Sequence, residues 1–424
     1  MVRALGVGRD YNKAVENAKK PCGHKPRDNT LKVLYVTTKP PWPAVDGGRL
    51  LVCHTLEGLA AAGHEVTLVA PSLGQETDDI AEALGRWCRP VLVPARPRPL
   101  PSALVFAQLR GQALSITRHA LVPVRHAVEK LLQEEAFDVV HVEQIQALAQ
   151  AQNARIPVVL REQNVESDLW RLTGNAEPGL KGLLARREAG RMARAERAAV
   201  ARCSTIALTQ DDAQRLQELA GSKYDVTVVR APFPSVLPPG NRSLEGDPPI
   251  VQMGSEGWLP NRDAIEWFCG SIWPEVHAAL PGTQLHVFGH TARKEIDGVS
   301  LNAVHWHPPP EESSTAFARG SIQVVPLRIG SGVRMKILEA WARRIPVVGT
   351  PTAVAGLEAE HDRDLLVAED AAGFVEAFRR LREEDNLRDQ LVEGGRRSLV
   401  ERHDPEKIVA DLCKVYENAI RRQP

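Results

Sequence analysis

Hydrophobic and polar positions along the chain alternate in a way that predicts strands and helices in turn. Short runs rich in Val, Ile and Leu, such as residues 31–38 and 64–71, are typical of buried strands, whereas residues 49–63 repeat apolar side chains with helical spacing. A strand, a helix and a second strand in succession form a βαβ unit with parallel strands. The first half of the chain is therefore predicted to be an α/β domain.

The second half repeats this rhythm. The expected strands there are residues 250–253, 284–288, 303–306, 321–326, 345–349 and 364–368. Helical segments separate them, so a second parallel sheet is expected. Two such parallel sheets in one chain predict an α/β protein of two domains, with a ligand cleft between the domains at the carboxyl ends of their strands.

A proline-rich stretch separates the two halves. Residues 231–249 carry many prolines and two glycines, which predicts a stiff linker. Residues 1–29 are polar and unpatterned, which predicts a disordered tail. The expected organisation is a first domain at 30–230, the linker, a second domain at 250–404 and a closing helical segment at 405–424.

Composition excludes several classes of protein. Lys and Arg together number 53, as do Asp and Glu, so the zero formal charge argues against a general nucleic-acid binder. No apolar run reaches the roughly 18 residues of a spanning helix, and the N-terminus lacks an apolar stretch of signal-peptide length. The six cysteines are scattered singly, which suggests neither a zinc site nor a disulfide framework. We expect a soluble protein of a reducing compartment, the cytoplasm.

Two glycine-containing loops are candidates for binding phosphate. Gly47 and Gly48 lie between the first strand and the first helix, where a backbone without Cβ atoms and a helix N-terminus suit an anion. An ordinary tight turn fits the same residues. The pattern GxGxxG is absent, so a nicotinamide fingerprint is not supported.

The second loop, in residues 326–350, offers more chemistry. A strand ends at Pro326, a Gly-Ser-Gly loop follows, and a helix is expected from about Val333. The loop N–H groups could hold a diphosphate, with Arg334 and Lys336 neutralising it. Glu339 accepts hydrogen bonds only, which suits a pair of ribose hydroxyls. A plain surface ion pair between Glu339 and Lys336 is an equally good interpretation of these residues alone.

These segments together resemble the retaining glycosyltransferases of family four, which have the GT-B fold. The resemblance is carried by GSGVRMKILEAWARRIPVVGT, by the opening VTTKPPWPAVDGGRLLVCHTLEGLAAAGHEVTLVAP, by FDVVHVEQ and by GSEGWLPNRDAIEWF. It runs from about residue 31 to residue 420 with the motifs in order. It implies two Rossmann-like domains facing across a cleft, with the nucleotide-sugar donor in the C-terminal one and the acceptor mainly in the N-terminal one.

The resemblance also implies roles for individual residues. Glu339 matches the glutamate that holds the donor ribose. Other donor-binding positions match the loop that cradles the diphosphate and sugar, the glycines that face the diphosphate, and the main chain near the nucleobase. These are Gly330, Ser331, Gly332 and Val333, then Gly47 and Gly48, then His305 and Trp306.

Two departures from the family pattern concern the donor site. The family often has a second glutamate eight residues before the ribose-binding one, and this chain has Ser331 there. It also often has an Arg and Lys pair after the first strand of the C-terminal domain, where only Arg262 is a candidate here. A surface helix charge is the alternative for Arg262, and Arg334 or Lys336 could supply the missing charge.

Polar residues at the strand ends of the first domain are candidates for catalysis and for acceptor binding. His141 and Glu143 end one strand, and a histidine can transfer protons near neutral pH. Glu143 takes the place where many relatives carry an acceptor-side histidine. A hydrogen-bonded strand-end residue is the alternative for His141. The next strand is followed by further acceptor-site candidates that are expected to point toward the cleft, namely Arg161, Glu162, Gln163 and Asn164.

Two basic stretches allow two interpretations each. Residues 92–118 mix prolines, apolar residues and arginines, which could lie at a membrane surface or acceptor site, or form a surface connector and a packing helix. Six arginines between Arg186 and Arg202 could meet an anionic or membrane partner, or form a solvated helix face, the simpler explanation. Peripheral contact with the inner face of a membrane stays open.

The resulting hypothesis is transfer of a sugar, with retained configuration, from a nucleoside diphosphate to a hydroxyl group. A UDP-linked donor is expected first, and the acceptor is a cell-surface polysaccharide, a lipid-linked precursor or a natural product. The family implies that the leaving phosphate helps to deprotonate the acceptor. No Asp-x-Asp follows a strand near the donor loop, so no catalytic metal and no cofactor besides the nucleotide-sugar co-substrate are expected.

Two other functions fit the same residues. One is a nucleotide-sugar epimerase, which would isomerise the donor without an acceptor. The other is a non-catalytic nucleotide-sugar-binding partner, which Ser331 makes conceivable. A nicotinamide-dependent oxidoreductase is less favoured because the phosphate fingerprint is missing.

Overall fold

The chain folds into two parallel-sheet domains. The computed structural model describes residues 30–73, 77–221, 223–240, 242–296, 298–310 and 313–422. The predicted disordered tail at 1–29 lies outside these residues. The first domain takes residues 30–232 and 405–422 with the short segment 331–333, and the second takes 233–330 and 334–404.

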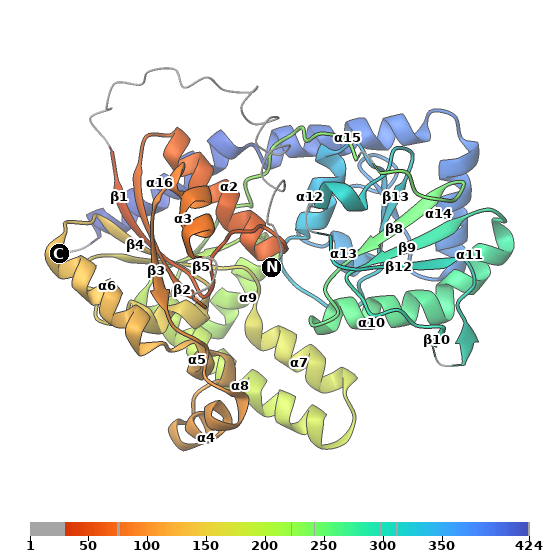
Figure 1. Cartoon of the computed structure of the whole chain (residues 1–424). Coiled ribbons are helices and arrows are strands. Elements are labelled where there is room, and N and C mark those ends of the chain that lie inside the picture. The colour runs from red at the N-terminus through yellow and green to blue at the C-terminus, as the bar shows by residue number, and fades with distance from the viewer. Residues whose placement is uncertain are drawn as a thin grey trace. The chain divides into compact units, whose positions relative to one another are not determined.

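The sheet of the first domain has seven strands, all parallel, in the order β3-β2-β1-β4-β5-β6-β7 (Figure 1). Its strands are β1 (Lys32–Val36), β2 (Glu65–Ser72), β3 (Arg89–Pro94), β4 (Val139–Glu143), β5 (Val158–Glu162), β6 (Ser204–Ala207) and β7 (Val226–Val228). The strand order changes direction at β1, which lies between β2 and β4. In open parallel sheets, ligands bind beyond the carboxyl ends of the strands at such a point.

Side chains alternate along β1 because successive residues of a strand point to opposite faces of the sheet. Val33 and Tyr35 belong to an apolar cluster with α2, α3 and α16, whereas Leu34 and Val36 belong to one with α6 and α8. The helices of this domain are α2 (Gly47–Ala61), α3 (Thr77–Gly85), α4 (Leu100–Arg110), α5 (Leu114–His119), α6 (Val122–Glu134), the 3₁₀ turn η1 (Ile145–Gln150), α7 (Glu166–Ala176), α8 (Gly179–Arg202), α9 (Gln210–Ala220) and α16 (Pro405–Arg421). The sheet therefore has a core on each face.

The last helix of the chain, α16, packs on the first domain. Its buried residues Val409, Leu412 and Tyr416 lie in the same apolar cluster as Leu56 and Leu59 of α2. The closing segment predicted at 405–424 is thus part of the N-terminal domain, although it follows the C-terminal one in sequence.

The sheet of the second domain has six parallel strands in the order β12-β9-β8-β13-β14-β15. They are β8 (Pro249–Met253), β9 (Gln284–Phe288), β12 (Val304–His307), β13 (Ile322–Val325), β14 (Val347–Gly349) and β15 (Leu366–Val367), and a small antiparallel pair is β10 (Glu295–Ile296) and β11 (Val299–Ser300). The helical elements are α10 (Leu259–Trp267), the π-helical turn η2 (Phe268–Ile272), α11 (Trp273–Ala279), the 3₁₀ turn η3 (Ser313–Ala316), α12 (Met335–Ala342), α13 (Pro351–Val354), α14 (Ala371–Glu383) and α15 (Leu387–Arg402). All six expected strands are present, although the last three, β13, β14 and β15, are shorter than predicted.

The basic stretch on α8 is only partly a solvated face. Arg191 is buried and pairs with Glu188, with 2.7 Å between Nη1 and Oε1. Arg197 and Arg202 donate to the backbone carbonyls of Leu219 and Gln152. The other five arginines are exposed, so the prediction of a solvated face is confirmed for most of this stretch and is wrong at Arg191. Within the described part of the chain, no helix has both the length and the apolar character needed to cross a bilayer.

Two helical glycines should respond to alanine in opposite ways. A Cβ on Gly394 of α15 would come 1.8 Å from the carbonyl oxygen of Arg363, whereas a Cβ on Gly190 of α8 would meet nothing within 4 Å. We predict that Gly394→Ala lowers the free energy of unfolding by at least about 2 kcal/mol through overpacking. Gly190→Ala should raise it by up to about 1 kcal/mol through helix propensity. Urea unfolding of the two variants checks this, and equal effects would contradict it.

Candidate functional site

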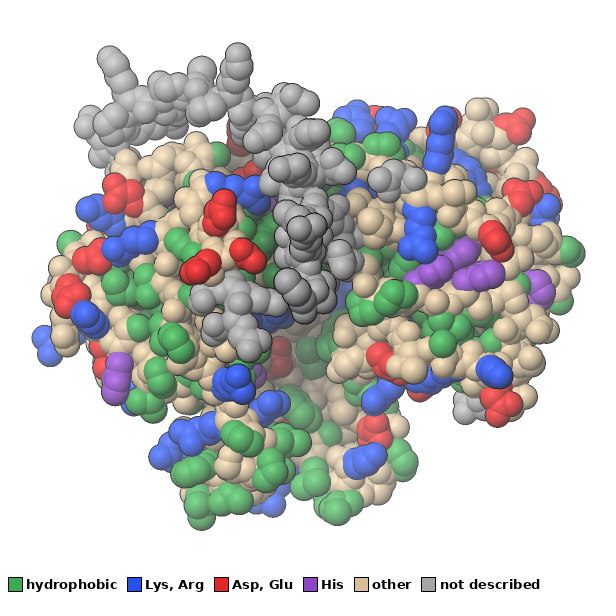
Figure 2. Space-filling model, in the orientation of Figure 1, with side chains coloured by type: hydrophobic (Ala, Val, Ile, Leu, Met, Phe, Trp, Pro, Cys, Tyr) green, Lys and Arg blue, Asp and Glu red, His purple; other side chains and the backbone are tan. Residues whose placement is uncertain are grey.

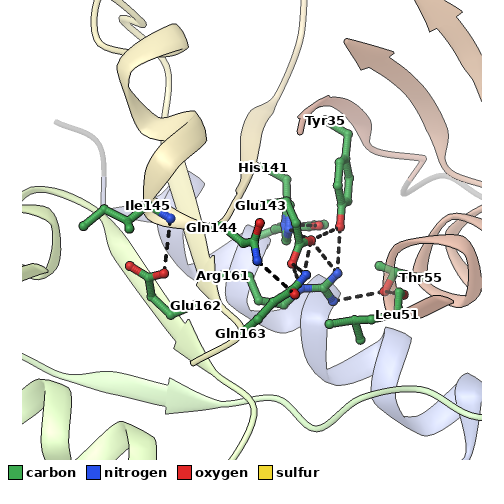
Figure 3. A network of polar contacts seen from close by, with 11 residues as sticks. Tyr35, Leu51, Thr55, His141, Glu143, Gln144, Ile145, Arg161, Glu162 and Gln163 are labelled. Carbon is green, nitrogen blue, oxygen red and sulfur yellow. Dashed lines mark hydrogen bonds and ion pairs between the residues drawn. The ribbon is translucent and has the colours of Figure 1, made fainter. Parts of the chain in front are cut away.

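A network of polar side chains lies at the carboxyl ends of β4 and β5, next to β1 (Figure 3). At its centre Arg161 of β5 donates to Glu143 of β4, with 2.6 Å between Nη2 and Oε2 and 3.0 Å between Nε and Oε1. Arg161 also donates to the hydroxyls of Tyr35 at 2.7 Å and Thr55 at 3.0 Å. Both charged side chains are buried, so the ion pair is shielded from solvent.

The ionisation of Glu143 follows from this pairing. Burial alone would raise the pKa of Glu143, but the Arg161 charge outweighs burial and holds the pKa below its usual range. The carboxylate is therefore ionised at neutral pH and accepts hydrogen bonds only. Tyr35 donates its hydroxyl to the same carboxylate.

His141 is enclosed in the same network. Its ring stacks on Tyr35 with 4.2 Å between the centroids, and Nδ1 lies 2.8 Å from the Tyr416 hydroxyl. Burial lowers the pKa of His141 to about 4, so the ring is neutral at pH 7. Nε2, 3.4 Å from Glu143, must carry the hydrogen because the carboxylate only accepts. Nδ1 then accepts from Tyr416.

Both residues predicted to be catalytic thus bind protein groups inside the domain. They link β4 to β1, to β5 and to α16. Proton transfer by His141 or Glu143 stays a prediction, and the structure gives both a part in holding these elements together.

Gln163, directly after β5, connects the buried pair to the strand ends. Its Nε2 donates to Glu143 Oε1 at 3.0 Å, and its Oε1 accepts from Gln144 at 3.1 Å. A Cβ on Gly48 would come 2.8 Å from Gln163 Oε1, so the glycine makes room for this amide. Gln144 is absent from the sequence-based candidates. Its position one residue after β4, the counterpart of Gln163 after β5, is the signal that could have identified it.

The first turn of α2 adds a positive helix end to this region. Asp46 caps the helix by accepting from Arg49 N at 2.9 Å, and Lys39 lies 2.7 Å from its other oxygen. Burial raises the pKa of Asp46, but Lys39 and the helix bonds outweigh it and lower the pKa overall. This cap explains why α2 begins at Gly47, two residues before the predicted start. Gly47 and Gly48 therefore lie where the helix dipole favours an anion.

The expectation that Arg161 and Glu162 point outward does not match their geometry. Both side chains are buried, because Arg161 turns toward Tyr35 and Thr55, and Glu162 Oε2 accepts from Ile145 N at 3.2 Å. Asn164 is half-buried after β5. Acceptor binding by these residues stays a prediction.

Three buried or nearly buried carboxyl groups lie near one another behind the strand ends. Burial is the main cause that raises the pKa of Glu162 and of Glu166, and it raises the pKa of Glu196 to about 7. Neighbouring carboxylates add to the shift in Glu162 and Glu196. Glu196 Oε1 accepts from Ser167 N at 3.1 Å, which tethers α8 to the start of α7.

The Gly-Ser-Gly loop joins β13 to α12. Gly330 and Gly332 have φ angles of 153° and 78°, which side chains with a Cβ rarely adopt. A Cβ on Gly330 would lie 2.3 Å from Arg334 Nη2, so the buried guanidinium lies directly against the loop backbone. Arg334 also stacks on Trp258, 5.8 Å from the ring centroid. The helix begins at Met335, two residues later than expected.

Glu339 is held by α12 itself and by η3. Its Oε1 lies 3.0 Å from Nε and 2.9 Å from Nη2 of Arg343, and it accepts from the Ser313 hydroxyl. Lys336 instead donates to the Met253 carbonyl at 2.6 Å and to Asn261 at 3.1 Å. The interpretation of Glu339 and Lys336 as a surface ion pair is therefore wrong. Burial, with the nearby Arg334 charge, lowers the pKa of Lys336 to about 7.

The remaining donor-site candidates of the second domain lie on β12 and α10. Nε2 of His305 lies 2.9 Å from Oε1 of Gln284, and the His305 ring stacks on His286 with 4.8 Å between the centroids. Trp306 points to the opposite face and packs against the apolar core. Arg262 is half-buried in the first turn of α10. Among the described residues, no three His, Cys, Asp or Glu side chains are grouped so that they could hold a metal ion.

Replacing Glu143 by Gln should destabilise the first domain strongly. The change leaves the Arg161 charge buried without its carboxylate, so we predict a loss of about 3–5 kcal/mol in the free energy of unfolding. Glu135→Gln is the control, since Glu135 pairs with Arg89 at 2.7 Å on the surface and should cost at most about 1 kcal/mol. Denaturant unfolding measures both, and equal losses would argue against a buried pair.

Glu196→Gln should change how stability depends on pH. The folded-state pKa of Glu196 is raised to about 7, so the wild type loses stability as pH rises from the unfolded pKa to that value. The variant lacks this loss. Relative to wild type it should gain up to about 3 kcal/mol between roughly pH 4 and pH 8. Glu218→Gln, at an exposed position on α9, should show no such trend. A constant difference for Glu196→Gln would refute the raised pKa.

Two family models match the chain. The model described as "Glycosyl transferase 4-like domain" matches residues 46–232, and the model described as "Glycosyl transferases group 1" matches residues 248–384. The first match falls within the first domain and the second within the second domain. No curated protein sequence gives a significant match.

Solved structures match over nearly the whole chain at low identity. Sucrose-phosphate synthase from Thermosynechococcus elongatus is 15% identical, with a TM-score of 0.68 over 92% of this chain and 99% of that chain. The Anabaena protein HepE in complex with UDP-glucose is 13% identical, with a TM-score of 0.60 over 92% and 100%. A glycosyltransferase from Rickettsia africae is 12% identical, with a TM-score of 0.59 over 93% and 100%.

Proposed function

Because the chain belongs to the group 1 glycosyltransferases and has their GT-B fold, we propose that it moves a sugar from a nucleoside diphosphate to a hydroxyl group with retained configuration. The donor tested first is a UDP-sugar, since HepE, which shares the fold, was solved with UDP-glucose and with UDP. The proposed acceptor is a glycan, a lipid-linked precursor or a natural product. One arrangement carries the proposal, namely the Gly330–Val333 loop followed on α12 by the fixed carboxylate of Glu339.

Glu339 is prepared to bind a pair of hydroxyl groups. The contacts from Arg343 and Ser313 fall on Oε1, and they hold the carboxylate in one orientation. We assign Oε2 to the donor ribose. A fixed acceptor of this kind costs little conformational entropy on binding.

The loop before α12 is suited to the diphosphate. Its glycines leave the backbone accessible, and the Arg334 guanidinium lies against Gly330. Negative charge grows on the leaving diphosphate in the transition state. Hydrogen-bond donors and cations that already point at that charge lower the barrier most effectively.

The first domain would supply the acceptor side of the reaction. In the family mechanism the leaving phosphate helps to deprotonate the acceptor, so no protein base is required. Glu143 then acts through Gln163, whose amide it orients at the end of β5. Gly47 and Gly48, at the N-terminus of α2, stay predicted donor-binding positions because the helix end favours an anion.

Replacing Glu339 by Gln should weaken nucleotide binding. The variant loses a charged acceptor for the ribose hydroxyls, so the dissociation constant should rise about tenfold or more. Isothermal titration of the purified protein with UDP, GDP and dTDP, with and without magnesium, measures this. The matched control is Glu393→Gln, an exposed glutamate on α15 that pairs with Arg396 at 2.7 Å.

The outcomes separate the alternatives. Metal-independent binding of one nucleotide, lost in Glu339→Gln and kept in Glu393→Gln, supports the proposal. Unchanged binding in Glu339→Gln together with a lower melting temperature would show that the carboxylate is only structural. Conversion of the matching sugar nucleotide to an isomer without any acceptor would indicate an epimerase. Binding without turnover across acceptors would indicate a non-catalytic binding partner.

A further inference from the structure

In helix α4 the small hydrophobic residues face the protein and the large ones face outward, which is the reverse of a normal surface helix. Its buried residues are Ala103 and Ala107, whereas Leu104, Val105 and Leu109 are exposed, Leu109 by 79%. A surface helix ordinarily turns its large apolar residues toward the core. This helix therefore presents an apolar face to the outside.

The first turns of α8 show the same inversion. Gly182 and Ala185 are buried there, whereas Leu180, Leu183 and Leu184 are exposed, Leu180 by 71%. A Cβ on Gly182 would lie 2.1 Å from the Glu177 carbonyl oxygen, so the turn between α7 and α8 leaves no room for a larger residue on the inner side. The leucines are consequently on the outside.

The two apolar groups belong to one side of the first domain. Arg191 of α8 donates to Gln108 of α4 at 2.6 Å, and Glu188 of α8 accepts from Leu114 N at 2.7 Å. Helix α4 follows the carboxyl end of β3, and α7 and α8 follow the carboxyl end of β5. In Figure 2, hydrophobic side chains gather over both helices, with basic side chains beside them. We call Leu104, Val105, Leu109, Leu180, Leu183 and Leu184 the α4/α8 surface.

The charges beside α4 are of one sign, whereas residues 166–188, which include α7 and the start of α8, carry four acidic and four basic side chains. Residues 95–120, which include α4 and α5, contain four arginines and no aspartate or glutamate, in a chain whose acidic and basic residues are equal in number. Arg98 and Arg110 lie 4.8 and 5.7 Å from the ring centroid of Phe106, so guanidinium groups flank an exposed aromatic ring on α4. On α8, Arg187 and Lys181 are exposed beside the leucines.

We propose that the α4/α8 surface docks on an anionic lipid membrane. Exposed leucines, valine and phenylalanine would enter the boundary between headgroups and acyl chains, while the arginines pair with lipid phosphates. A second copy of this chain fits poorly, because a two-fold interface would bring the same arginines face to face. The proposal does not depend on the sugar-transfer reaction.

The surface lies on the edge of the sheet that also carries Gln163 and Asn164, since β3 and β5 are parallel and both helices follow carboxyl ends. If the proposed transfer also holds, an acceptor anchored in the membrane would be presented to this edge. That consequence rests on the proposed function, and the docking experiment below uses no substrate, so the two can fail separately.

Sedimentation with lipid vesicles tests the docking. The full chain should bind vesicles containing phosphatidylglycerol and bind pure phosphatidylcholine far more weakly, with affinity falling as salt rises. The double variant Leu104→Ser with Leu109→Ser should bind about tenfold more weakly or worse. The double variant Arg98→Gln with Arg110→Gln, which removes the two guanidinium groups beside Phe106, should lose most of the preference for anionic lipid.

A matched control removes two exposed hydrophobic residues elsewhere. Val236→Ser with Val400→Ser should bind vesicles as the wild type does. Equal binding of the wild type to vesicles with and without phosphatidylglycerol would overturn the proposal, as would unchanged vesicle binding by the leucine variant. So would a wild-type dimer, seen by light scattering, that the leucine variant dissociates, because a second copy would then cover the surface. Since the replaced leucines are exposed, the circular dichroism spectrum and melting temperature of the leucine variant should match those of the wild type.

Discussion

The first domain is organised around one buried ion pair, between Arg161 and Glu143. Through it β5 is joined to β4, and through the hydroxyls of Tyr35 and Thr55 the same guanidinium reaches β1 and α2. His141 extends the network to Tyr416 of α16, so the last helix of the chain is tied to the centre of the N-terminal sheet. A buried charge of this kind tolerates the loss of its partner poorly, so the ion pair ties the carboxyl ends of β4 and β5 together.

The second domain uses a similar device for a different purpose. Arg343 fixes the Glu339 carboxylate in one orientation, but this pair lies within one helix and its C-cap residue, directly after the glycine loop. In the first domain both oxygens of Glu143 accept hydrogen bonds from protein groups, and the carboxylate orients the amide of Gln163. In the second, Oε1 takes the internal contacts, and Oε2 is the atom we assign to ligand. The two glutamates therefore have separate proposed roles, one positioning and one binding.

Periodicity was sufficient to predict most strands and the two parallel sheets, because buried parallel strands are short apolar runs. It missed β3, whose carboxyl half lies in the stretch 92–118 that was assigned to a connector or a membrane-surface segment. It could not predict that Arg161 and Glu162 turn inward, since their partners Tyr35, Thr55 and Ile145 lie on other elements. Nor could spacing decide whether Glu339 pairs with Lys336 or Arg343, because both are neighbours on a helix. The inverted helices were readable in principle, from alanines where leucines would be expected. Recognising them required knowing which side of each helix packs on the sheet.

The proposed sugar transfer depends on nucleotide binding by the Gly330–Val333 loop and Glu339. A crystal structure of the protein with UDP tests it most directly. We expect the ribose hydroxyls to lie within hydrogen-bond distance of Glu339 Oε2 and the diphosphate to lie against the loop backbone beside Arg334. A well-ordered UDP bound elsewhere, with Glu339 still engaged only by Arg343 and Ser313, would contradict it.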